Sequence, residues 1–126
     1  MNQSIDEHHI LLVEDDKMLS RYTLKYLEKQ SIDVVHAPDG ERALALLETQ
    51  GFRVIVTDLN MPKTDGLAFV TELRQRGSKT PVIVTTGVAD KKVHEQLYAL
   101  GVDKIYVKPL LPDTYLELIE HIKRYQ

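Results

Sequence analysis

Five short apolar runs alternate along the chain with longer amphipathic stretches. The runs are rich in β-branched residues, which predicts strands over residues 9–13, 32–37, 54–57, 82–85 and 105–107. In the stretches between them apolar side chains recur at intervals of three and four, which predicts helices around residues 19–27, 43–47, 67–73, 93–100 and 115–122. The chain therefore reads as five strand–helix units, (βα)5.

Strands that are apolar throughout, separated by helices, indicate a parallel sheet that is buried on both faces. Right-handed crossovers leave few ways to connect such a sheet. The predicted fold is a doubly wound five-stranded parallel α/β domain over residues 9–126, preceded by a flexible N-terminal segment at residues 1–8. The six glycines lie between or at the ends of the elements, where positive φ costs least.

Composition narrows the classes of function. The 126 residues, 43% hydrophobic and 28% charged, fit one ordinary globular domain. No apolar run approaches the roughly 20 residues that cross a bilayer and no signal peptide is visible, so a cytoplasmic location without membrane contact is expected. The absence of cysteine excludes thiol chemistry. Interleaved charges with a net charge of -3 show no cationic stripe, so direct nucleic-acid binding is not expected.

Acidic residues follow two of the predicted strands. Glu14, Asp15 and Asp16 come after the first strand, and Asp58 ends the third. Ligands of parallel α/β sheets bind at these carboxyl ends. A single acid there commonly caps the next helix, and we expect this role for Asp16. Several crowded carboxylates repel one another unless a cation joins them, and a small oxygen-only ligand set suits Mg²⁺.

The remaining polar residues at the strand ends suggest phosphoryl chemistry. A carboxylate beside Mg²⁺ can attack phosphorus, as in aspartyl-phosphate formation, while a cation and hydrogen-bond donors neutralise the equatorial oxygens. Lys108 after the fifth strand supplies a cation and Thr86 at the end of the fourth supplies a hydroxyl. Main-chain N–H groups near Asn60 and Gly87 could complete a phosphoryl site.

Four motifs occur in order over about residues 10–125: ILLVEDD, VTDLNMPKTDG, PVIVTTG and GVDKIYVKPL. In these motifs the sequence resembles the receiver domains of two-component response regulators, which are CheY-like phospho-acceptor switches. The resemblance implies phosphorylation of Asp58, with Thr86 as the switch hydroxyl and Lys108 as the phosphate-contacting cation. It also implies that Mg²⁺ is held by Glu14, Asp15, Asp58 and the main-chain carbonyl of Asn60.

The resemblance further implies partners. The phosphoryl donor is expected to be a sensor histidine kinase or a His-phosphotransfer protein, and a downstream effector or output domain is expected at the face made by the fourth helix, fifth strand and fifth helix. The helical periodicity places Tyr98 and Leu116 at the surface as candidate interface residues.

The five histidines are expected to be surface or helix-cap residues. The resemblance also implies that the bond between Lys108 and Pro109 is cis.

Two alternatives share part of this pattern. A Mg²⁺-dependent phosphohydrolase of the haloacid dehalogenase type also forms an aspartyl-phosphate, but it needs a second acid where this chain has Asn60. A flavodoxin-like cofactor binder would share the fold, but acids after the first strand disfavour an anionic flavin phosphate there.

One position departs from the receiver pattern. The family's switch aromatic lies three residues before the conserved lysine, where this chain has Ile105. Tyr106 is its neighbour, and alternation along a strand places the two side chains on opposite faces. We therefore expect a smaller conformational change than an aromatic at position 105 would give.

Overall fold

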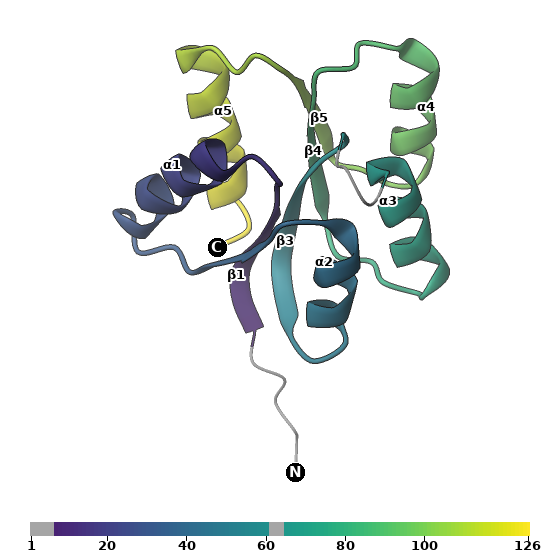
Figure 1. The fold of residues 1–126 in the computed structure, drawn as a ribbon, viewed down its shortest axis with the longest axis horizontal. Coiled ribbons are helices and arrows are strands. Elements are labelled where there is room, and N and C mark those ends of the chain that lie inside the picture. The colour runs from purple at the N-terminus through teal and green to yellow at the C-terminus, as the bar shows by residue number, and fades with distance from the viewer. Residues whose placement is uncertain (1–6, 61–64) are drawn as a thin grey trace.

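The computed structural model describes residues 7–60 and 65–126, with side chains described from Ile10 onward. One parallel five-stranded sheet with the order β2-β1-β3-β4-β5 lies at its centre (Figure 1). The strands are β1 (Glu7–Val13), β2 (Val34–Ala37), β3 (Gly51–Asp58), β4 (Val82–Thr86) and β5 (Lys104–Val107). The predicted doubly wound α/β fold is confirmed.

The helices cover both faces of the sheet. On one side lie α1 (Lys17–Glu28) and α5 (Pro112–Lys123), and on the other lie α2 (Gly40–Leu47), α3 (Gly66–Gln75) and α4 (Lys91–Ala99) (Figure 1). Successive residues of a strand point to opposite faces, so Ile10 and Leu12 enter the core under α1 and α5 while Leu11 enters the other core. Because the central strands are buried on both faces, their middle residues are apolar, and polar residues lie at the carboxyl ends.

Aspartates set the starts of four helices. Asp16, Asp39, Asp65 and Asp90 each accept a hydrogen bond from a main-chain N–H of the first turn that follows. The predicted capping role of Asp16 is therefore confirmed. The fifth helix begins instead with Pro112, which needs no N–H donor at that position.

The glycines serve two different purposes. Gly77 and Gly101 follow α3 and α4 with φ of 85° and 81°, as predicted for helix ends. The other four glycines, Gly40, Gly51, Gly66 and Gly87, do not have positive φ, so a positive φ does not explain them. Gly66 is required for a different reason. A Cβ there would lie 2.6 Å from the Cα of Leu59 and 2.8 Å from the carbonyl oxygen of Asp58, so Gly66 is needed for close packing of α3 against the end of β3.

Strand boundaries differ from the sequence-based prediction. β1 begins at Glu7 instead of residue 9 and β3 at Gly51 instead of residue 54, because main-chain pairing between these strands continues into polar residues. The predicted flexible segment lies mostly outside the described residues, as do Met61 and Pro62 of the loop motif. In the part of the chain that is described, no helix has the length and apolar character needed to cross a membrane.

Candidate functional site

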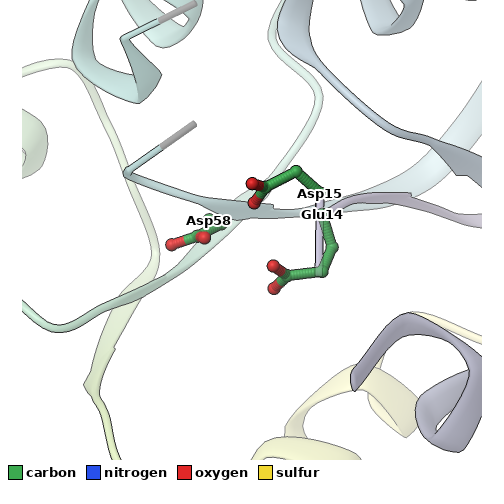
Figure 2. A group of neighbouring side chains, drawn as sticks. All are labelled: Glu14, Asp15 and Asp58. Atoms are coloured by element: carbon green, nitrogen blue, oxygen red, sulfur yellow. The ribbon is translucent and has the colours of Figure 1, made fainter. Parts of the chain in front are cut away.

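Three carboxylates meet at the carboxyl edge of the sheet. Glu14 and Asp15 follow β1, and Asp58 is the last residue of the neighbouring β3. The pairing of Val13 with Thr57 brings the two strand ends level. One oxygen from each of Glu14, Asp15 and Asp58 lies within 4.8 Å of the others, and the three side chains converge on one region (Figure 2). We call these three residues the acidic cluster.

Burial makes the acidic cluster electrostatically costly. Glu14 is 3% exposed and Asp58 is 5% exposed, whereas Asp15 is open to solvent. Burial and, second, the nearby charge of Asp58 raise the pKa of Glu14 to about 7, while Lys108 and the main-chain N–H of Asp16 act in the opposite direction. The cluster therefore holds more negative charge than its surroundings compensate.

Lys108 is the cation of this site. Its Nζ lies 3.3 Å from Oδ2 of Asp58 and 3.4 Å from Oε1 of Glu14, so one ammonium group is shared by two buried carboxylates. Its position is fixed by the main chain, because its N–H donates to the carbonyl oxygen of Thr86. The bond from Lys108 to Pro109 is cis, as predicted.

Asn60 follows Asp58 by two residues, and Thr86 ends the neighbouring strand β4. The main-chain N–H of Asn60 donates to Oδ1 of Asp58 at 3.3 Å. Thr86 is fully buried at the end of β4, next to the residue that pairs with Asp58, and its Oγ1 accepts the N–H of Val88 at 2.9 Å. The structure thus brings the predicted residues to one edge of the sheet, with Lys108 and Asn60 in direct contact with Asp58.

Comparison with known proteins identifies the family. Residues 10–120 match the family model of the response regulator receiver domain. The chain belongs to this family. It is a phospho-accepting signalling domain, and its fold and acidic cluster are those expected of a receiver.

The relatives of this receiver domain include a longer protein and a protein whose structure contains a metal ion. It is 30% identical over 105 residues to the transcriptional regulatory protein SrrA of Staphylococcus aureus, covering 83% of the chain and 43% of SrrA. The receiver domain of Francisella response regulator 1452 is 30% identical with a TM-score of 0.84, covering 94% and 95% of the two chains. The Mn²⁺-bound form of response regulator Rcp1 is 29% identical with a TM-score of 0.78, covering 92% and 91%. The chain thus spans less than half of the length of SrrA.

Two contacts of this receiver domain were not visible in the sequence. Nε2 of His36, at the end of β2, lies 2.7 Å from the carbonyl oxygen of Glu14 and holds the start of the loop that carries the acidic cluster. Nε2 of His94 on α4 lies 2.8 Å from the carbonyl oxygen of Val88, the residue whose N–H is bound by Thr86. A lone histidine in a strand or helix gives no signal for either contact, so both were expected only as surface or cap residues.

Ile105 and Tyr106 face opposite sides of the receiver sheet, as predicted. Ile105 is buried in the core under α2, α3 and α4, and Tyr106 in the core under α1 and α5. The hydroxyl of Tyr106 forms a hydrogen bond of 3.1 Å with Nδ1 of His121 on α5. Tyr106 therefore occupies the face opposite to the one where the family has its switch aromatic.

Proposed function

We propose that this receiver domain accepts a phosphoryl group on Asp58, beside Mg²⁺ held by Glu14, Asp15, Asp58 and the main-chain carbonyl of Asn60. The observation that carries the proposal is the acidic cluster itself: three carboxylates within 4.8 Å, two of them buried, sharing Lys108 as their cation. All of the side-chain donors are oxygens and one of them is solvent-exposed, which fits a hard divalent cation that keeps part of its water shell.

The residues around Asp58 have separate roles in the transfer. Asn60 holds Oδ1 of Asp58, which fixes the orientation of the attacking carboxylate. A carboxylate oxygen forms the new bond to phosphorus as the phosphorus–nitrogen bond of a phosphohistidine donor breaks, and the electron pair leaves with the imidazole. Bound Mg²⁺ supplies positive charge that offsets the negative charge on the phosphoryl oxygens.

Lys108 and Thr86 stabilise the product in this proposal. Lys108 already lies 3.3 Å from Asp58, so its ammonium group can shift from Asp58 to a phosphoryl oxygen with little movement. The Thr86 hydroxyl accepts the N–H of Val88 and can donate its own hydrogen at the same time. Donation to a phosphoryl oxygen would link Asp58 to the loop that precedes α4.

The proposal includes the binding partners of this domain and its location in the cell. The donor is a sensor histidine kinase or a His-phosphotransfer protein, and the output partner is a downstream effector or output domain that reads the face made by α4, β5 and α5. Tyr98 on this face is 48% exposed, and its hydroxyl accepts the N–H of Ile105 at 3.3 Å, which joins α4 to β5. The protein works in the cytoplasm on its own aspartate and does not turn over other phosphate esters.

Phosphorylation in vitro tests the assignment. Incubation with acetyl phosphate and Mg²⁺, followed by intact-mass analysis, should add one phosphate to the wild type and none to Asp58→Asn. The adduct should be lost in base, as expected of an acyl phosphate. Asp16→Asn is the matched control, because Asp16 lies in the same loop but caps α1, and this variant should be labelled like the wild type.

Two results would contradict the proposal. An adduct that persists in Asp58→Asn would place the modified residue elsewhere. Steady multiple-turnover hydrolysis of p-nitrophenyl phosphate with Mg²⁺ that is lost in Asp58→Asn would indicate a phosphohydrolase.

A further inference from the structure

One histidine joins α4 to the loop that precedes it. His94 is half-buried in the first turn of α4, and its Nε2 lies 2.8 Å from the carbonyl oxygen of Val88. A carbonyl oxygen only accepts hydrogen bonds, so Nε2 carries the proton of this contact. The main-chain N–H of His94 donates to the carbonyl oxygen of Asp90 at 3.1 Å. His94 therefore holds two residues of the loop at once, and residues 88–94 form one closed unit.

Val88 is held from the other direction by the hydroxyl of Thr86. The N–H of Val88 donates to Oγ1 of Thr86 at 2.9 Å, and Thr86 is fully buried. Among the described residues, the main chain of residues 87–89 makes no other hydrogen bond. The side chain of Val88 packs against the core, whereas Gly87 and Ala89 are exposed. Val88 is therefore the residue at which the loop is fastened, on one side to Thr86 and on the other to α4.

A second contact ties α4 to β5 one turn further along the helix. The hydroxyl of Tyr98 accepts the N–H of Ile105 at 3.3 Å. Ile105 itself has no polar side-chain atom with which to respond to Thr86, and Tyr106 lies in the core on the opposite face of the sheet. His94 and Tyr98 are four residues apart and lie on the same face of α4. The side chains of α4 thus make contacts to the main chain of its neighbours where the side chain of Ile105 makes none.

These contacts connect the phospho-acceptor site to α4 through a single side chain. We propose that His94 is a positioning residue of the switch, whose hydrogen bond to Val88 makes the first turns of α4 follow the hydroxyl of Thr86. The inference rests on the proposed function, because a phosphoryl group on Asp58 is what draws that hydroxyl. When Oγ1 of Thr86 turns toward a phosphoryl oxygen, the N–H of Val88 must move with it or lose its acceptor, which is costly for a half-buried main-chain group. Val88 therefore moves, and the closed unit of residues 88–94 moves with it.

Two substitutions separate the hydrogen bond of His94 from its bulk. His94→Ala removes the donor to Val88, whereas His94→Gln places an amide N–H group near the position of Nε2 and restores it. Beryllium trifluoride with Mg²⁺ serves as the phosphoryl mimic, and main-chain amide chemical shifts report the response of each residue. In the wild type and in His94→Gln the response should extend from Thr86 into residues 91–97. Loss of one hydrogen bond changes the balance between two positions of α4 about fivefold, so in His94→Ala the response over residues 91–97 should fall to about half or less.

Two further variants control for helix composition and for the path of the coupling. Glu95→Ala truncates the exposed neighbour of His94 on the same helix and should keep the wild-type response. Thr86→Val removes the hydroxyl that holds Val88, so it should also reduce the response of α4. Because Thr86 and His94 act through the same residue, Thr86→Val combined with His94→Ala should reduce that response no further than the more severe of the two single changes.

Several results would overturn the coupling through His94. One is a full α4 response in His94→Ala, and another is a loss in His94→Gln as large as in His94→Ala. Labelling of Asp58 by acetyl phosphate is measured on the same samples. A wild type that is labelled, but whose amide response stops at Gly87, contradicts the coupling alone. A wild type that is neither labelled nor shifted at any residue contradicts the phospho-acceptor assignment, and the coupling with it.

Discussion

Glu14 carries an ionisable group in a place that disfavours its charge. The side chain is nearly closed to solvent, and it shares the single ammonium group of Lys108 with Asp58. One cation between two buried carboxylates leaves net negative charge where water cannot screen it. The raised pKa of Glu14 is the direct consequence, and it ties the stability of the metal-free protein to pH.

The first prediction concerns this pH dependence. Burial raises the pKa of Glu14 from 4.5 to about 7. Below pH 4.5 the group is protonated in both the folded and the unfolded protein and contributes nothing. Between these values the unfolded chain has released the proton that the folded protein still holds, so the free energy of unfolding should fall as pH rises. Above about 7 the loss should be complete, on the order of 3 kcal/mol.

Urea unfolding in the presence of EDTA, repeated from about pH 5 to pH 8, measures the loss. Glu14→Gln should flatten the decline, and Lys108 keeps Asp58 as its partner in that variant. Glu41→Gln removes an exposed carboxyl and should keep the wild-type decline. An equal decline in Glu14→Gln would show that another group is responsible.

At the scale of single residues, the sequence predicted the members of the site better than their contacts. Glu14, Asp58 and Lys108 each follow an apolar run, so their positions at strand ends could be predicted directly from the sequence. That Lys108 is shared between Glu14 and Asp58, and that His36 contacts the Glu14 carbonyl, depends on distances between strands that are far apart in sequence. No local pattern encodes such distances.

The junction between β3 and α3 packs directly against the chain next to Asp58. The N–H of Gly66 donates to the carbonyl oxygen of Leu59 at 2.8 Å, so the first turn of α3 lies directly against the chain that follows Asp58. A methyl group at Gly66 would overlap main-chain atoms, which cannot move without moving Asp58. A Cβ added at Gly87, after Thr86, would meet no neighbouring atom within 4 Å.

The second prediction compares these two glycines. Gly66→Ala should lower the free energy of unfolding by about 1–3 kcal/mol through overpacking, and should slow labelling of Asp58 by acetyl phosphate. Gly87→Ala makes the same chemical change without overlap and should be neutral or stabilising by up to about 1 kcal/mol, because alanine restricts the unfolded chain. Urea unfolding of both variants gives the comparison. Equal losses in the two would contradict the packing argument.

The carboxyl ends of the strands could be predicted from the sequence more closely than the helix starts, because the first turn of each helix lies outside the apolar pattern. Capping residues and glycines give the better signal for helix boundaries. Asp16 precedes a helical pattern and caps it, and Gly77 and Gly101 mark the ends of helices. The early start of β3 at Gly51 could not be predicted, because it depends on main-chain pairing with β1 and not on side-chain pattern. Arg74 is a similar case: its guanidinium donates to the carbonyl oxygens of Leu100 and Thr80, and joins the end of α4 to the loop after α3.

For the whole molecule, the acidic cluster joins two strands at the centre of the sheet. β1 and β3 are neighbours in the strand order, and each contributes carboxylates at its end. The site therefore exists only when the sheet is assembled, and a cation that binds the cluster binds the folded protein alone. Metal binding and global stability must then be linked.

The third prediction is that Mg²⁺ raises the melting temperature of the protein. Binding only to the folded state adds about 2.7 kcal/mol when the free ion reaches about 100 times its dissociation constant. Asp15→Asn should reduce the increase while changing the metal-free stability little, since Asp15 is exposed. Asp16→Asn keeps the cap of α1 and should respond to Mg²⁺ like the wild type. The increase should be larger at about pH 8 than at about pH 6, because Mg²⁺ binds the ionised form of Glu14 and burial holds the pKa of that group near 7. No increase at millimolar Mg²⁺, or an equal one in Asp15→Asn, would contradict the proposed metal ligands.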